Sequence, residues 1–224
     1  MKFFDDKNKN VNKWNRNYFY IGTIIIILIN ILLFELLGDD WNDNIMQIDN
    51  SSHWEDLFYF NPIIVSFFDA FEHSNLQHVL LNMLCFAICG LYLERKTGSL
   101  GILGLVIFSA FISGIACTCN NLSVGSHGFS GVNYFLYAYI IFDFFFNLRK
   151  GKRDKTNNML GIIVILFIYV AMCFSGGVTE FSFKFYPHDL MYNSGHYSSF
   201  LIGCVISLFK NIVEISAEKA VKKC

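Results

Sequence analysis

Two short stretches of the sequence carry a serine and a histidine that could react together. Ser130 lies in GFSGVNY, residues 128–134, and His196 lies in NSGHYSSF, residues 193–200. A serine hydroxyl is a weak nucleophile until a neighbouring base takes its proton, and neutral histidine suits that role near pH 7. If the fold brings them together, Ser130 and His196 predict nucleophilic catalysis by a serine–histidine dyad.

Hydrogen-bond donors for such a reaction lie at the start of another apolar segment. Amide hydrolysis passes through a tetrahedral intermediate whose oxyanion needs donors aimed at it. His78 and Asn82 are spaced i, i+4, so they lie on one face of a helix and can point at a common atom. Together with the backbone N–H of Ser130, they are candidates for an oxyanion hole.

Each of these residues also has an ordinary structural interpretation. Serine is a favoured helix N-cap, and Gly128 and Gly131 would let the chain turn tightly around Ser130. The two donor candidates, taken alone, fit an interfacial cap and a helix–helix hydrogen bond. Tyr134, one turn below Ser130 on the same face, fits aromatic packing as well as a wall that orients an imidazole. The combination, rather than any single member, indicates catalysis.

The elements that hold these residues are apolar segments of membrane-spanning length. Hydrophobic residues make up 54% of the 224 residues and charged residues only 16%, which is too apolar for a soluble globule. Six apolar segments are present: 18–37, 77–93, 101–119, 131–146, 159–174 and 195–209. We therefore expect an all-α integral membrane protein, a bundle of six transmembrane helices. No basic stripe suggests binding to nucleic acid.

Basic residues set the orientation of this bundle. They cluster before the first segment and after the second, fourth and sixth, and only Lys184 lies in the other connections. By the positive-inside rule, both termini are cytoplasmic. The chain then divides into a polar, uncleaved N-terminal segment 1–17, a membrane domain 18–212 with a long outer loop 38–76, and a cytoplasmic tail 213–224.

The same topology places the reactive residues at one depth. The second, fourth and sixth segments all run from outside to inside, so His78, Ser130 and His196 lie near the outer face. After Ser130 the fourth segment rises about 22 Å, which is less than the roughly 30 Å of a bilayer core. Ser130 is therefore expected below the outer surface, at the bottom of a wet cavity.

A stripe of small residues on the sixth segment indicates close helix packing. Gly195, Ser199 and Gly203 are spaced four apart, which lets two helix backbones approach each other. His196 adjoins this stripe. If the packing partner is the fourth segment, the His196 imidazole can reach the Ser130 hydroxyl.

With these motifs in place, the sequence resembles the rhomboid family of intramembrane serine proteases in its simple six-helix form, over roughly residues 58–212. HSNLQHVLLNM (73–83) is similar to the family's second-helix signature, and GFSGVNY to its Gly-x-Ser-Gly with a downstream tyrosine. The GH at 195–196 is similar to the start of the family's last helix. The joint order of these motifs is specific, whereas Gly-x-Ser-Gly alone is a weak signal.

The resemblance implies a serine endopeptidase that cleaves transmembrane helices at a site near or within the outer leaflet. Ser130 would be the nucleophile and His196 the base, without a carboxylate, and His78, Asn82 and the Ser130 amide would form the oxyanion hole. The other implied roles are structural. Tyr134 would stack beside His196, and His73 would form a hydrogen bond within the first outer loop. Gly128, Gly131 and Gly203 would support the turn and the helix contact, Glu94 would connect neighbouring segments, and the loop 175–194 would cap the site.

The expected surroundings follow from the same resemblance. The partners are transmembrane-helix proteins and the lipid bilayer, and no cofactor or metal site is visible. The expected location is the cell membrane (plasma or inner), with the site opening to the outer face.

Two features depart from the family: a Trp-Arg pair is missing where the sequence reads NPIIVSFF (61–68), and Ser199 replaces a glycine. The Ser199 hydroxyl would either push two helices apart or hydrogen-bond across them. Asp143, near the inner end of the fourth segment, is expected to reach the membrane–water interface or Lys150.

Two other functions stay open. A catalytically silent rhomboid-like protein would bind and escort membrane helices, although such relatives typically lose the serine or the histidine. A metal-binding or transport protein would use His73, His78, His127 and His196 near the outer face. That alternative lacks a His-Glu-x-x-His element and a charged pair within the membrane.

Overall fold

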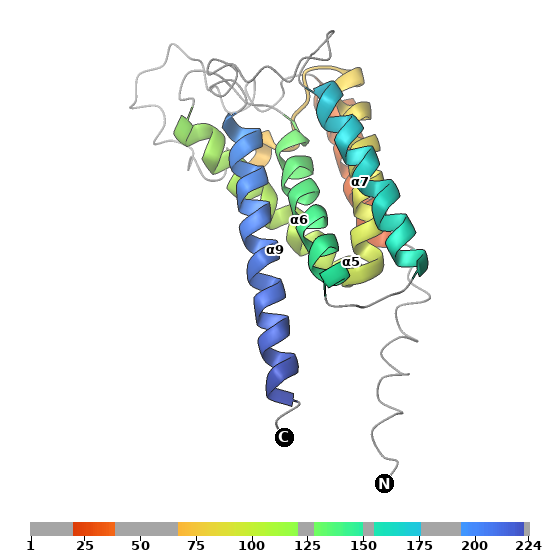
Figure 1. Ribbon diagram of the computed structural model, residues 1–224. Coiled ribbons are helices and arrows are strands. Elements are labelled where there is room, and N and C mark those ends of the chain that lie inside the picture. Colours follow the sequence, from red (N-terminus) through yellow and green to blue (C-terminus); the bar gives the residue numbers. More distant parts are fainter. Residues whose placement is uncertain (1–19, 39–66, 121–127, 150–154, 176–193, 222–224) are drawn as a thin grey trace.

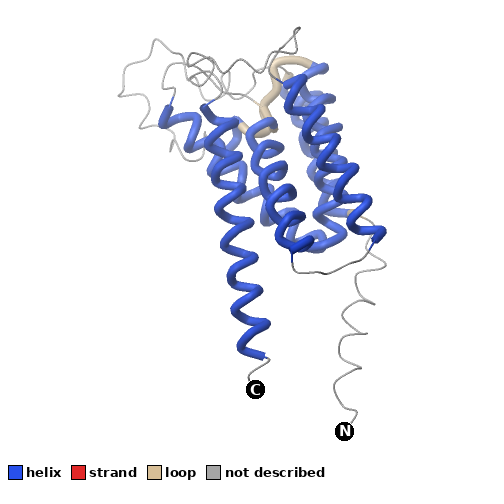
Figure 2. Tube along the Cα trace, in the orientation of Figure 1, coloured by secondary structure: helices blue, strands red, loops and turns tan. Residues whose placement is uncertain are grey.

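The computed structural model describes residues 20–38, 67–120, 128–149, 155–175 and 194–221, most of which are helical. The helices are α2 (Ile21–Leu37), α5 (Leu76–Asn120), α6 (Ser130–Arg149), α7 (Lys155–Ser175) and α9 (Ser194–Val221). Figures 1 and 2 show their arrangement, and the described residues contain no strand. The prediction of an all-α fold is thus confirmed for the part of the chain that is described.

Helix α5 is two helices that meet at a sharp break. Gly98 has φ 76° and ψ 170°, a left-handed conformation inside an otherwise helical run. Glycine adopts such a φ without the steric cost that a Cβ atom brings. The predicted second and third segments therefore lie on either side of Gly98.

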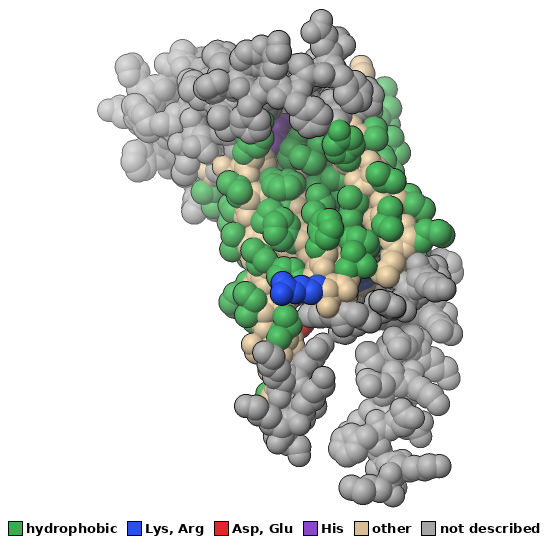
Figure 3. All heavy atoms as spheres, in the orientation of Figure 1, with side chains coloured by type: hydrophobic (Ala, Val, Ile, Leu, Met, Phe, Trp, Pro, Cys, Tyr) green, Lys and Arg blue, Asp and Glu red, His purple; other side chains and the backbone are tan. Residues whose placement is uncertain are grey.

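The surfaces of these helices are suited to an apolar solvent. Among the described residues, three stretches are long and apolar enough to cross a membrane: Leu76–Ile115, Ser130–Arg149 and His196–Ala217. Ile21–Leu37 and Asn158–Met172 are shorter apolar helices. In Figure 3 hydrophobic side chains cover most of the described surface on the visible face, with Lys and Arg at its lower edge. Such a band of apolar side chains is what a lipid-exposed helix surface requires.

Helix α6 lies in the middle of the bundle, between α7 and α9 in Figure 1. Between Gly131 and Ile140 all of its residues are buried, and Phe135, Leu136 and Ile140 are among those with no exposed surface. A helix that is apolar and buried all round forms the core of a bundle. Its first residue, Ser130, thus begins a helix whose next ten residues are buried in the bundle.

Polar side chains tie the helices together at the end opposite to Ser130. The Glu94 carboxylate accepts hydrogen bonds from the backbone N–H groups of Gly22 (2.9 Å) and Thr23 (2.8 Å) and from the Thr23 hydroxyl (2.6 Å). A carboxylate at the start of a helix satisfies its unpaired N–H groups and its dipole. The expectation that Glu94 connects neighbouring segments is confirmed.

Asp143 lies at the same end and has two lysine partners. It forms ion pairs with Lys96 (3.1 Å) on α5 and Lys210 (2.7 Å) on α9. Asp143 is buried, so its charge requires partners inside the bundle. The predicted contact with Lys150 lies outside the described residues.

The sixth predicted segment is longer than its hydropathy indicates. Helix α9 continues to Val221, beyond residue 209 and into the predicted tail 213–224. Residues 210–221 include Ala, Glu and Lys, which are good helix formers without being apolar. The segment 1–17 and most of the outer loop 38–76 lie outside the described residues. The number of membrane crossings and the side on which the termini lie stay predictions.

Candidate active site

Ser130 and His196 lie in contact at the start of their helices. The Nε2 atom of His196 is 2.7 Å from the Ser130 Oγ atom, a hydrogen-bond distance. Ser130 is the first residue of α6, and His196 belongs to the first turn of α9. When Nε2 accepts this hydrogen bond, the other ring nitrogen, Nδ1, carries the proton.

Small residues let the backbones approach closely enough for this contact. A side chain at Gly131 would collide with the Ser113 hydroxyl of α5, and one at Gly203 would collide with the main-chain oxygen of Phe135 on α6. The predicted packing of the sixth segment on the fourth is therefore present. Ser199 is fully buried in the same contact, and its hydroxyl has no hydrogen-bond partner among the described residues. It lies near Gly131, where an added Cβ atom would be 3.5 Å away, at ordinary van der Waals distance.

The imidazole is held from its other side by an aromatic ring. The rings of Tyr134 and His196 are stacked, with their centroids 4.5 Å apart and their planes 11° from parallel. Tyr134 is one turn after Ser130 on α6 and is itself buried. One helix therefore supplies both the hydroxyl and the surface against which the histidine lies.

His78 and Asn82 lie beside the turn that precedes Ser130. Gly128 has φ 114°, and a side chain there would come within 2.9 Å of His78 Nε2 and 3.6 Å of Asn82 Nδ2. Both nitrogen atoms thus approach the backbone two residues before Ser130. The positive φ and this close approach are two independent reasons why residue 128 is glycine.

The start of α5 holds His78 in this orientation. The Asn75 side chain accepts a hydrogen bond from the His78 backbone N–H (2.9 Å), as an N-cap residue does. The Ser74 Oγ atom lies 3.3 Å from His78 Nδ1. When the Ser74 hydroxyl donates to Nδ1, the proton of a neutral imidazole is on Nε2, the nitrogen beside Gly128.

His73 packs behind His78. The two rings meet edge to face with centroids 5.1 Å apart, and His73 Nδ1 donates to the main-chain oxygen of Phe71 (3.2 Å). Burial lowers the pKa of His73 to about 4, with a smaller contribution from His78. His73 is therefore neutral near pH 7 and serves as a fixed support.

The segment that leads into Ser130 is anchored by its own residues. The backbone N–H of Gly128 donates to the main-chain oxygen of Asp69 (2.9 Å). Phe129 is fully buried, and its ring meets those of Phe71 and Phe86 edge to face, with centroids 5.8 Å and 5.0 Å away. These contacts fix the position at which α6 begins.

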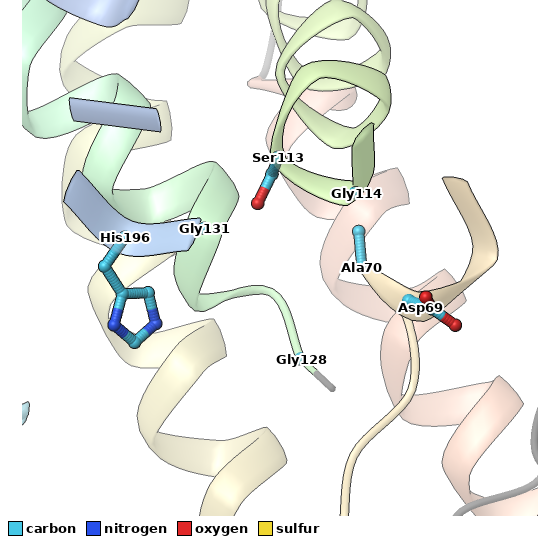
Figure 4. A pocket seen from close by; sticks show the side chains of 7 residues that line it. All are labelled: Asp69, Ala70, Ser113, Gly114, Gly128, Gly131 and His196. Atoms are coloured by element: carbon cyan, nitrogen blue, oxygen red, sulfur yellow. The ribbon is translucent and has the colours of Figure 1, made fainter. Parts of the chain in front are cut away.

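A small pocket opens between α5, α6 and α9 beside the histidine. It is lined by Asp69, Ala70, Ser113, Gly114, Gly128, Gly131 and His196. Figure 4 shows His196 on one side of this space and the Ser113 hydroxyl on the other. The lining combines small residues with hydroxyl and imidazole groups, which suits a space that admits water.

Asn133 is a polar residue that the sequence reasoning missed. Its side-chain nitrogen donates to the main-chain oxygen (3.1 Å) and to the side-chain oxygen (3.2 Å) of Asn82. The available signal was an asparagine one turn after Ser130 in an apolar helix, since polar groups in such helices need a partner. The predicted capping loop 175–194 lies almost wholly outside the described residues, as does His127.

Comparison with protein families identifies the family of this chain. The family model of the Rhomboid domain matches residues 63–211, which is most of the chain and includes every residue of the candidate site. This range agrees with the resemblance at 58–212. No curated protein matches the chain.

Proposed function

The chain belongs to the rhomboid family, and we propose that it is an intramembrane serine endopeptidase that cleaves transmembrane helices with Ser130 as nucleophile and His196 as base. It is an integral, multi-pass membrane protein. The observation that carries the proposal is the 2.7 Å contact between His196 Nε2 and Ser130 Oγ.

In the first step of the proposed reaction, the Ser130 hydroxyl attacks the carbonyl carbon of the scissile peptide while His196 Nε2 takes its proton. The resulting imidazolium then gives this proton to the leaving amine, and an acyl-enzyme forms on Ser130. Water repeats the sequence with His196 again as the base. No carboxylate orients the imidazole in this scheme, and its stacking on Tyr134 serves that purpose instead.

The oxyanion of each tetrahedral intermediate is bound by His78, Asn82 and the Ser130 backbone N–H. The approach of the first two side chains to Gly128 supports this role. Removing one donor of an oxyanion hole typically costs about 2.7–4 kcal/mol of transition-state stabilisation. The supporting residues have indirect roles: Gly128, Gly131 and Gly203 permit close approach, and His73 supports His78.

The proposed setting is a six-helix bundle with both termini in the cytoplasm and the site opening to the outer face of the cell membrane. The polar ends of α5, α6 and α9 that carry His78, Ser130 and His196 support a common depth. The pocket beside His196 would supply the water that hydrolysis consumes.

A catalytically silent escort is the alternative from a different class. The rhomboid family contains inactive members, and these typically lack the serine or the histidine. Both residues are present here and their side chains are in contact, which favours an active enzyme.

The test is cleavage of a fluorescent transmembrane-helix substrate by the full-length protein in proteoliposomes. We expect cleavage by the parent and none by Ser130→Ala or His196→Ala. Ser207→Ala is the matched control. Ser207 is a fully buried serine on α9 whose hydroxyl donates to the main-chain oxygen of Tyr139, and it lies away from His196. Cleavage that survives Ser130→Ala would refute the mechanism, and substrate binding without any cleavage would establish the escort function.

A further inference from the structure

Asn82 and Asn133 form a buried pair of amides between α5 and α6. Asn133 is 2% exposed and Asn82 is 7% exposed, so both residues are almost completely shielded from solvent. Asn82 is one of the candidate oxyanion donors, and Asn133 contacts it from α6, one turn after Ser130 on the same helix. Hydrophobic packing does not account for this contact, because burying an amide in an apolar bundle costs the free energy of removing it from water.

The orientation of each amide is determined by a main-chain oxygen. A side-chain amide can be turned over so that its oxygen and nitrogen exchange places, and its partners decide which arrangement holds. The nitrogen of Asn133 lies 3.1 Å from the main-chain oxygen of Asn82, which can only accept a hydrogen bond. Asn133 therefore presents its NH2 group to α5.

The same reasoning then orients Asn82. Its side-chain oxygen lies 3.2 Å from the Asn133 NH2 group, and its side-chain nitrogen lies 3.1 Å from the main-chain oxygen of His78. Turning the Asn82 amide over would bring two NH2 groups together and two oxygen atoms together. Asn82 is consequently held with its oxygen toward α6 and its NH2 group toward Gly128 and the candidate oxyanion hole.

Asn133 is held in this position at a cost. Its own side-chain oxygen is buried and has no hydrogen-bond partner among the described residues. A buried acceptor without a partner is unfavourable, and an aliphatic side chain at this position would avoid that penalty. A role of the Asn133 NH2 group in the active site would explain why this unfavourable burial is present.

We propose that Asn133 is a positioning residue, which fixes the amide of Asn82 so that its NH2 group faces the oxyanion. The inference rests on the proposed function, because it assigns Asn133 a part in the same reaction. Asn133 does not touch the substrate. It acts by keeping one N–H of Asn82 directed at the negative charge that develops in the transition state.

The test is a double-mutant cycle on cleavage of the fluorescent transmembrane-helix substrate, with kcat and KM measured for each variant. Asn133→Leu should lower kcat by roughly 10-fold to 100-fold, up to the loss caused by removing one oxyanion donor. KM should stay within about twofold, since only the transition state carries the charge. In an Asn82→Ala background, which has already lost the donor, Asn133→Leu should change the residual kcat by no more than about twofold.

Asn211→Leu is the matched control. Asn211 is a fully buried asparagine on α9 that donates to the main-chain oxygen of Ser207 (2.8 Å), and its side-chain oxygen also has no partner among the described residues. It should alter thermal stability as Asn133→Leu does while leaving kcat within about twofold of the parent. Asn133→Val is the second variant if the leucine does not fit.

The outcomes separate the two proposals. A parent that does not cleave would overturn both. A cleaving parent that is silenced by Ser130→Ala, but whose kcat is unchanged by Asn133→Leu and Asn133→Val, would overturn the role of Asn133 alone. Equal losses from Asn133→Leu in the parent and in Asn82→Ala would also overturn it, because they would show that Asn133 acts independently of Asn82.

Discussion

Gly203 lies directly on the main-chain oxygen of Phe135, so closely that any side chain at residue 203 would collide with it, and would come within 3.0 Å of the Ala138 Cβ atom. The contact joins α9 to α6 where both are buried. His196 is two turns before Gly203 and therefore on the same face of α9. The separation of the helices at Gly203 thus controls how near the imidazole comes to Ser130.

Gly203→Ala should weaken this contact and the activity together. Overpacking of a close helix contact typically costs about 1–3 kcal/mol, and a shift of α9 would lengthen the hydrogen bond between His196 and Ser130. We expect a lower melting temperature and at least a roughly 10-fold lower kcat. Gly104→Ala is the control, because no atom lies within 4 Å of a side chain there. Equal behaviour of the two variants would show that the Gly203 contact does not govern the dyad.

Tyr134 should contribute to catalysis through its ring. Aromatic stacking is typically worth about 0.5–1.5 kcal/mol, which corresponds to a few-fold up to about 10-fold in rate. Tyr134→Leu should lower kcat by this amount because the His196 ring loses the surface that orients it. Tyr134→Phe keeps the ring and should stay within about threefold of the parent. A phenylalanine variant as slow as the leucine variant would assign the effect to the hydroxyl instead.

Asp143 should matter for stability rather than for chemistry. Its carboxylate is buried between Lys96 and Lys210, whose side chains are about one-third exposed at 31% and 35%. Breaking a buried ion pair can cost 3–5 kcal/mol, and partial exposure of the lysines reduces the expected loss for Asp143→Asn to about 1–3 kcal/mol. Thermal unfolding in detergent measures it. Glu214→Gln, which removes the longer 3.6 Å pair with Lys210, should cost less than about 1 kcal/mol.

His73 should make the fold sensitive to acid. Its pKa is lowered to about 4 by burial, whereas the unfolded chain has the ordinary histidine value of about 6.5. Between these values the unfolded state binds more protons, so this contribution to stability is fully present above pH 6.5 and is lost as the pH falls toward 4. At pH 5 the loss is about 2 kcal/mol.

The measurement for His73 is the melting temperature of the parent and of His73→Asn at pH 7 and pH 5. Asparagine can still donate to the Phe71 oxygen but does not titrate. We expect the parent to lose more thermal stability than the variant on acidification. An identical loss in both would show that other groups cause the acid sensitivity.

The helices were predictable because long apolar runs leave few alternatives. From residue 21 on, each predicted segment lies in a helix, and the break at Gly98 falls between the second and third segments. The end of α9 was not predictable from hydropathy, because residues 210–221 continue the helix with polar helix formers. Apolar runs indicate where a helix enters lipid but not where its hydrogen bonds stop.

The part of the site that could be predicted is the part whose residues are placed by the direction of the helices. Ser130 and His196 begin two helices that run the same way, and the small-residue stripe on α9 favoured the contact that Gly203 makes. Asn133 and Asp143 were different, since their partners lie on other helices and far away in the sequence. A polar residue in an apolar segment indicates that a partner exists, but only packing identifies it.

The most direct test of the proposed dyad is labelling of the full-length protein in detergent with a serine-directed fluorophosphonate, followed by mass spectrometry of the adduct. The dyad predicts one adduct on Ser130, none on Ser130→Ala, and labelling of His196→Ala slowed by at least about 100-fold. Labelling that persists in Ser130→Ala, or that proceeds at the parental rate in His196→Ala, would contradict a hydroxyl activated by that imidazole.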